Sequence, residues 1–132
     1  MKSILIFSVV LVVFSACSKY EGQGGAATIK GVVIEQKYNS LNNPIPNGSY
    51  PAADQDVFII YGADNSFYDD DIKTSFDGSF EFRYMRKGTY RIFTYEDCNT
   101  CPSGKKEVIK EVEISEKNQE LLMDTIYIKK QI

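Results

Sequence analysis

Aromatic and charged side chains alternate from Phe80 to Tyr84, and this pattern constrains the fold more than any other feature of the chain. A period of two places the rings of Phe80, Phe82 and Tyr84 on one face of a β-strand. Glu81 and Arg83 then lie on the opposite face. One face of this strand is therefore expected in a hydrophobic core and the other in water, as in a sheet that is covered on one side.

Turn signals divide the rest of the chain into short β-type runs. Asp77-Gly78 predicts a tight turn, which we expect to join two strands of a hairpin within residues 72–85. The segment 36–54, rich in Asn, Pro, Gly and Ser, is expected to be a long loop. Seven strands and no helix are predicted, which favours an all-β fold, an antiparallel sandwich. The strands are expected at 28–35, 55–62, both arms of 72–85, 89–96, 106–115 and 121–130.

The N-terminus predicts export. Lys2 is followed by an apolar run that ends at Phe14 and is too short to span a bilayer comfortably. FSAC, residues 14–17, resembles the lipobox of bacterial lipoproteins, in which the chain is cut before the cysteine and the cysteine carries the lipid. The resemblance implies that residues 1–16 are a lipoprotein signal peptide and that Cys17 is the lipidation site. Ser18 is not the Asp that favours inner-membrane retention, so we expect a lipid-anchored protein of the cell envelope, at the outer membrane.

Residues 17–27 are polar and glycine-rich, and we expect a lipid-anchored flexible tether there, followed by one β-sandwich domain over 28–132. Removing Lys2 from the 15 basic residues leaves 14 against 18 acidic ones, a net charge of about −4. This balance argues against nucleic acid as a partner. The absence of histidine excludes a Ser-His-Asp triad, a Cys-His pair and an imidazole-ligated zinc site.

Two further cysteines, Cys98 and Cys101, lie in the stretch DCNTCPSGKK between predicted strands. They provide half of a zinc site at best. Redox-active C-x-x-C pairs normally begin a helix, whereas Pro102 and Gly104 follow this pair. In an oxidising compartment a local disulfide that braces the loop is favoured, and reduced thiols remain the alternative.

Other side chains suggest ligands only weakly. Asp69, Asp70 and Asp71, with Asp64 nearby, form an oxygen-rich stretch that could supply calcium ligands, but its spacing is not that of an EF-hand. A solvated acidic loop is the favoured interpretation, so we predict no metal and no cofactor. Most aromatic residues follow strand patterns and are expected in the core rather than on a sugar-binding platform. The exceptions are Tyr38, Tyr50 and Tyr68, which are expected in loops where a binding role is open.

A family resemblance covers residues 28–96. The stretch 74–95 resembles the carboxypeptidase regulatory-like domain family, through a T-x-x-x-G-x-F turn and a following G-x-Y. The residues that match the family's motifs are Ile29, Gly31, Val33, Pro44, Pro46, Thr74, Gly78, Phe80, Gly88 and Tyr90. Two features depart from the family: segment 36–54 is longer, and the cysteine loop is not part of its pattern. The resemblance implies a seven-stranded, transthyretin-like, Ig-like sandwich that serves as a structural or binding module, without peptidase activity.

These observations predict a non-enzymatic cell-envelope lipoprotein. Its β-sandwich is expected to act as a binding or assembly module, with the membrane as one partner through the lipid on Cys17 and a protein or a glycan as the other. The alternative is a thiol-active envelope lipoprotein that uses Cys98 and Cys101. A helix directly after Cys98 would distinguish the alternative, because a helix terminus lowers the pKa of a thiol.

Overall fold

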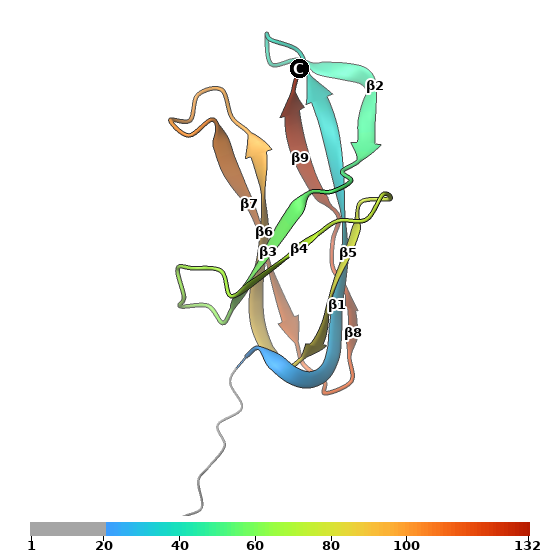
Figure 1. Ribbon diagram of the computed structural model, residues 1–132, viewed down its shortest axis with the longest axis vertical. Helices are drawn as coiled ribbons and strands as arrows, with labels where there is room; N and C mark the ends of the chain where they lie inside the picture. The colour runs from blue at the N-terminus through green and yellow to red at the C-terminus, as the bar shows by residue number, and fades with distance from the viewer. Residues whose placement is uncertain (1–20) are drawn as a thin grey trace, which may run out of the picture.

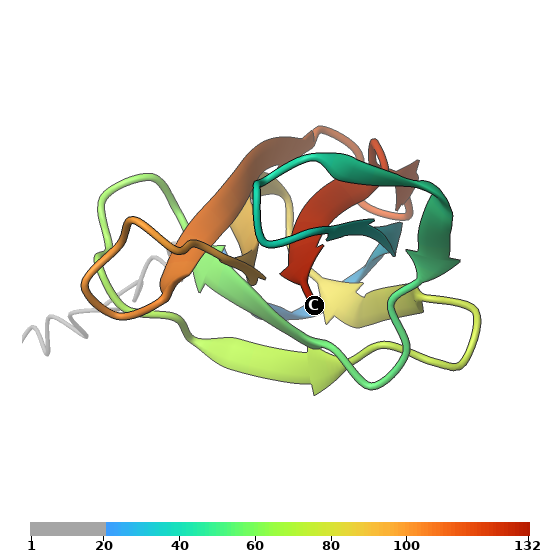
Figure 2. The ribbon, with the colours of Figure 1, turned by 90° about the horizontal axis from the view of Figure 1, so that it is seen from above.

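The computed structural model describes residues 21–132, which form nine strands in two packed sheets (Figure 1). Across these residues the chain forms no helix, and so none long and apolar enough to cross a membrane. Seen from above, the strands surround one interior (Figure 2). The strands are β1 (Gln23–Tyr38), β2 (Pro44–Pro51), β3 (Asp56–Tyr61), β4 (Asp70–Lys73), β5 (Ser79–Met85), β6 (Gly88–Asp97), β7 (Lys105–Ile114), β8 (Glu120–Leu122) and β9 (Ile126–Gln131).

The long strand β1 organises the first sheet, because it has a partner on each side along most of its length. β5 and β8 flank its N-terminal half, and β2 and β9 flank its C-terminal half. β2 and β5 run antiparallel to β1, whereas β8 and β9 run parallel to it. The prediction of a purely antiparallel sandwich is therefore wrong for this sheet, because the last two strands run alongside β1 in its own direction.

The second sheet has the order β4-β3-β6-β7 and is antiparallel throughout. β6 and β7 pair over ten residues each, from Gly88 opposite Ile114 to Asp97 opposite Lys105. β3 pairs with β6 only as far as Phe58 opposite Phe93, so β6 and β7 extend beyond the start of β3. This extension forms one wall of the candidate site described below.

Alternate residues of both sheets meet in the core, as expected for a sandwich. The prediction that Phe80 and Phe82 share the core face of their strand is confirmed, since both are buried. Tyr84 is the exception: its side chain is 66% exposed and its backbone adopts φ 59°. A β-bulge in β5 causes this, because Ala27 lies opposite Met85 and Ile29 opposite Phe82, so a single residue of β1 faces both Arg83 and Tyr84 and the alternation breaks there.

The count of seven strands is corrected to nine. Segment 36–54 is not one long loop, because β2 lies within it and pairs with the end of β1. Prolines at both ends of β2 are tolerated there because it is an outer strand. The expected strand 121–130 is split into β8 and β9, and β1 begins at Gln23, inside the expected tether.

The predicted turn at Asp77-Gly78 exists, but it does not close a hairpin. Gly78 has φ 79°, and its amide donates to the carbonyl of Ser75 at 2.9 Å. The carboxylate of Asp77 accepts the amide of Ser79 at 3.0 Å. The strands on either side belong to different sheets, since β4 pairs with β3 and β5 pairs with β1. The turn therefore carries the chain from one layer of the sandwich to the other.

Tyr90 ties the start of β1 to the second sheet. Its side chain is fully buried, and its hydroxyl accepts the amide of Gly22 at 2.8 Å and donates to the carbonyl of Arg86 at 2.7 Å. The bond to a backbone group four residues upstream is the arrangement known in β-sandwiches as a tyrosine corner. Here the same hydroxyl also fixes Gly22, directly before β1.

Candidate functional site, an aromatic patch beside a polar hollow

Four aromatic rings gather on the outer face of the second sheet. Val57 and Ile59 of β3 point into the core, so Phe58 between them points outward. Phe93 lies opposite Phe58 on β6 and therefore shares its face. We call the group of Phe58, Tyr68, Phe93 and Tyr95 the aromatic patch.

The rings of the aromatic patch contact one another in defined orientations. Phe58 and Phe93 stack, with centroids 4.9 Å apart and planes 17° from parallel. Tyr95 stands edge-on to both, with its centroid 5.7 Å from each. Tyr68, from the loop between β3 and β4, lies 4.8 Å from Phe58. Such pairs contribute about 0.5–1.5 kcal/mol each beyond their buried area, so the patch is an ordered surface.

The aromatic patch is open to solvent through two of its four rings, whereas Phe93 is buried. Tyr68 is 52% exposed and Tyr95 is 38% exposed, and Ile109 of β7, which lies opposite Phe93, is 51% exposed. Large rings held together on a solvent-facing sheet are unusual for a surface without a partner, because burying them elsewhere would remove apolar area from water. The arrangement is suited to contact with a ligand.

A hollow of about 230 Å³ adjoins the aromatic patch, where β3 separates from β6. Phe58 and Tyr95 line both the patch and the hollow. Ile128 of β9 adds an apolar side chain from the first sheet, so the hollow lies between the layers at one end of the sandwich. Its polar lining consists of Gln55, Asp56, Asp97, Lys105, Lys129 and Lys130.

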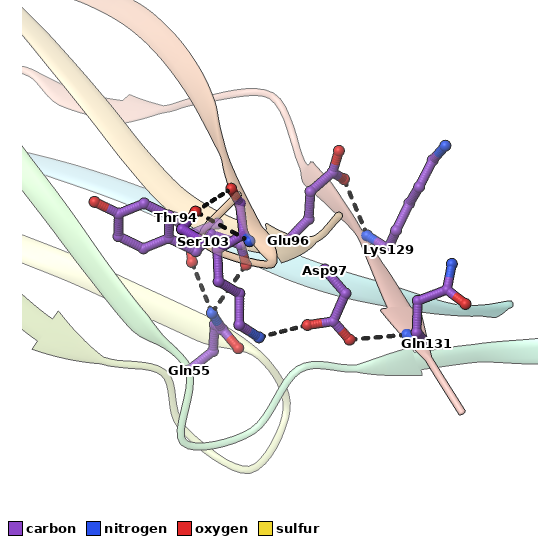
Figure 3. A network of polar contacts seen from close by, with 9 residues as sticks. Gln55, Thr94, Glu96, Asp97, Ser103, Lys129 and Gln131 are labelled. Atoms are coloured by element: carbon purple, nitrogen blue, oxygen red, sulfur yellow. Dashed lines mark hydrogen bonds and ion pairs between the residues drawn. The ribbon is translucent and has the colours of Figure 1, made fainter. Parts of the chain in front are cut away.

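Hydrogen bonds close the gap left where β3 departs from β6 (Figure 3). The amide nitrogen of the Gln55 side chain donates to the hydroxyl of Thr94 at 2.9 Å. That hydroxyl donates in turn to the carbonyl of Asp56 at 2.7 Å. Thr94 is fully buried, so these bonds satisfy a polar group that would otherwise destabilise the core.

Carboxylates of β6 hold the free edge of β9 against the second sheet (Figure 3). Asp97 accepts the backbone amide of Gln131 at 2.8 Å, and Glu96 accepts that of Lys129 at 3.1 Å. Asp97 also forms an ion pair with Lys105. These contacts fix the wall of the hollow that carries Lys129.

The contacts of Asp97 also set its charge. Partial burial alone would raise the pKa of this carboxyl, but the Lys105 ammonium and the Gln131 amide outweigh it and lower the pKa below 3.8. The stability contributed by the ionised carboxylate is present above pH 3.8 and is lost as the pH falls through the lower folded value. The carboxylate is therefore charged at neutral pH.

The cysteine loop connects the two strands that carry this ion pair. The Sγ atoms of Cys98 and Cys101 lie 1.96 Å apart, at disulfide distance, as predicted. The loop closes through the amide of Cys98, which donates to the carbonyl of Gly104 at 2.9 Å. The segment after Cys98 consists of turns rather than the helix that a redox-active pair would need. The geometry favours a brace between Asp97 and Lys105 over thiol chemistry.

Replacing both cysteines with serine (Cys98→Ser and Cys101→Ser) is expected to leave the sandwich folded and to make its loop more sensitive to protease. The loop they close is very small, so the stability lost is about 2 kcal/mol at most. Urea denaturation measures the loss, and mass spectrometry of the unreduced, alkylated protein measures the bond. Rapid alkylation of both thiols in the unreduced protein would contradict the brace and restore the thiol-active alternative.

The acidic side chains considered for calcium do not gather into a site. Asp69 accepts the backbone amide of Tyr61 at 2.7 Å, and Asp70 accepts that of Asp71 at 2.8 Å. Within residues 21–132, no three carboxylate or thiol side chains lie close enough together to hold a metal ion. Asp64 lines a separate hollow beside Gly62. Cys17, the predicted lipidation site, lies outside the described residues.

Of the four rings in the aromatic patch, only Tyr68 was expected in a loop where a binding role is open, and the other three were expected to pack in strands. The run 89–96 contained a usable signal: Tyr90 and Ile92 alternate with Phe93 and Tyr95, so both faces of the strand are apolar. In a two-layer sandwich only one of those faces can be buried between the sheets. The surplus rings must then lie on the outside.

Comparison with known proteins does not identify a family for this chain. No family model matches the chain, and no curated protein sequence matches it. Among solved structures, a "putative carbohydrate binding protein" from Pseudomonas aeruginosa is 14% identical, with a TM-score of 0.49, over 83% of this chain and 91% of that one. An (S)-allantoin synthase is 9% identical, with a TM-score of 0.44, over 80% of this chain and 42% of that one. The predicted carboxypeptidase regulatory-like family is not confirmed. The strand pairing itself shows an all-β sandwich of two sheets.

Proposed function

We propose that the chain is a non-enzymatic lipoprotein of the cell envelope whose sandwich binds an envelope ligand, a protein or a glycan, through the aromatic patch and the adjoining hollow. The observation that carries this proposal is the cluster of aromatic rings whose exposed members are Tyr68 and Tyr95. Tyrosine and phenylalanine are enriched at binding surfaces because their rigid rings supply contact area at little entropic cost. A binding role accounts for their position on the outside of the sheet.

The lipid anchor would set the orientation of this surface. Cys17 precedes Gly22 by only a few residues, and Gly22 is fixed by Tyr90 at the start of β1. The cysteine loop and the end of β9 lie at the opposite pole of the sandwich (Figure 1). An anchor on Cys17 would therefore hold the hollow away from the membrane surface. Fatty-acid labelling that is lost in a Cys17→Ser variant tests the anchor.

Binding by the aromatic patch can be measured on isolated cell envelopes of the source organism. The probe is the full exported chain with Cys17→Ser, so that a lipid does not contribute to sedimentation with the envelopes. Adding Tyr68→Ala and Tyr95→Ala together is expected to weaken binding by about tenfold or more, which corresponds to about 1.4 kcal/mol. The reason is the loss of both exposed rings of the patch.

Tyr127→Ala is the matched control, because Tyr127 is 66% exposed on β9 of the other sheet and lies outside the patch. Its binding should equal that of the parent protein. Melting temperatures of all variants establish that each one is folded. Equal binding by the patch variant and the control would overturn the proposed function.

A further inference from the structure

The geometry points to a neutral carbohydrate chain as the ligand, with one sugar unit in the hollow and the next unit on the aromatic patch. This inference rests on the proposed function and narrows its ligand to one chemical class. It is carried by the mixed charge of the hollow, by its size and by its continuity with the rings.

Charge disfavours ionic ligands in the hollow. Asp56 and Asp97 would repel an anion, and Lys105, Lys129 and Lys130 would repel a cation. Both carboxylates are already balanced locally, since Asp97 pairs with Lys105 and Asp56 pairs with Lys73 at 2.9 Å. A cation would have to compete with these pairs, and an anion bound by Lys129 would have to draw its ammonium off the ring of Tyr38, whose centroid lies 5.1 Å away. A neutral ligand need disturb neither contact.

Hydroxyl groups match the same lining. Each hydroxyl donates one hydrogen bond and accepts others, so one type of group can serve both the carboxylates and the ammonium groups. Asp97 keeps acceptor capacity beyond the Gln131 amide and Lys105, because a carboxylate has about four lone-pair sites. The side chain of Gln55 offers a carbonyl oxygen, while its nitrogen is held by Thr94. A polyhydroxylated ligand would leave few of these groups without a partner.

The size and the apolar walls favour a sugar over a larger polar molecule. At about 230 Å³, the hollow is smaller than the pockets of about 300–1,000 Å³ that hold drug-sized ligands, so it accepts one small ring. The C–H face of a sugar ring is apolar and slightly positive, and it packs against the negative face of an aromatic ring. Phe58 and Tyr95 line the hollow and continue into the patch, so a second unit can lie on them.

The test uses the same envelopes and the Cys17→Ser full chain. One portion of the envelopes is oxidised with periodate, which cleaves vicinal diols, and another is digested with protease. Binding that depends on Tyr95 is expected to fall at least tenfold after periodate and to survive protease. It should also change less than threefold between 50 mM and 500 mM salt, because salt screens charged contacts and leaves neutral ones. Tyr95→Ala reports the site, and Tyr127→Ala is the control.

The outcomes separate the two proposals. Tyr95-dependent binding that is lost with protease and survives periodate identifies a protein ligand, which overturns the carbohydrate inference and leaves the proposed function standing. Tyr95-dependent binding that falls more than tenfold at high salt identifies a charged ligand and also overturns the inference. If neither Tyr95→Ala nor the double patch variant weakens binding, the proposed function falls as well.

Discussion

Replacing Gly78 with alanine is expected to lower the free energy of unfolding by about 3 kcal/mol. Gly78 adopts φ 79°, a left-handed conformation that costs other residues about 1–2 kcal/mol. A Cβ atom at this position would also lie 2.4 Å from the carbonyl oxygen of Val33 and 3.2 Å from the amide of Ala52. Both are backbone atoms, so the crowding cannot be relieved by a change of rotamer and adds about 1–3 kcal/mol.

Gly104→Ala is the matched control for this prediction. Gly104 has a similar φ of 74°, but nothing lies within 4 Å of the position of its added Cβ. Its alanine variant therefore reports the conformational strain alone, and the difference between the two variants reports the contact with β1. Urea denaturation gives both values. If Gly78→Ala and Gly104→Ala lower the free energy of unfolding equally, the turn does not approach Val33 as closely as the structure shows.

Tyr90→Phe is expected to destabilise the fold by about 2 kcal/mol, because it removes one hydroxyl that serves two backbone groups. The amide of Gly22 and the carbonyl of Arg86 lose their partner, and a buried polar group left without one costs about 1–3 kcal/mol. Hydrogen exchange at Gly22 should accelerate more than exchange in β3 or β7, since the start of β1 is held directly by this bond.

The neighbouring Tyr61 supplies the control, because its ring lies 5.9 Å from that of Tyr90 and its hydroxyl makes no hydrogen bond within the described part of the chain. Tyr61→Phe should therefore leave stability nearly unchanged at neutral pH. Burial raises the pKa of Tyr90 above 10.0, so its contribution is present below pH 10.0 and is lost as the pH rises through the folded value. A Tyr90→Phe variant as stable as the parent would show that this bond does not hold Gly22.

Much of the fold was predictable because burial in a sandwich follows a simple period. The alternation that places Phe80 and Phe82 in the core depends only on strand geometry, and the strands β3, β6 and β7 were located from their β-branched and aromatic content. Strand pairing was harder to predict from the sequence than burial. The pattern around Asp77-Gly78 signals a change of direction, but a turn does not encode which sheet the next strand joins.

Two other local features could not be predicted from the residue types in the sequence. β2 begins and ends with proline, which ordinarily marks a loop, and only its place beside the end of β1 makes it a strand. Tyr84 continues the alternation in the sequence but is turned outward by a β-bulge in β5, where two residues face one residue of β1. Both depend on contacts between residues far apart in the chain, and a local pattern does not contain them.

The candidate site was partly predictable. The pairing of Cys98 with Cys101 was predicted from their spacing and from the expected oxidising compartment, and the structure places their sulfur atoms at bonding distance. The hollow was not predictable, because Gln55 directly precedes β3, whereas Asp97 lies on β6 and Lys130 on β9 of the other sheet. Its existence depends on where β3 parts from β6, which is a property of register.

The parallel pairing of β1 with β9 has a mechanical consequence. Val33 to Tyr38 lie beside Ile126 to Gln131 in register, and the chain enters β1 at one pole and leaves β9 at the other (Figure 1). Under the proposed anchoring on Cys17 and the proposed binding in the hollow, tension between the two ends would pull these strands past each other along their length. Such a shearing load is shared by the whole ladder, whereas a peeling load breaks one hydrogen bond at a time. The sandwich would resist being pulled open while tethered, even where its equilibrium stability is modest.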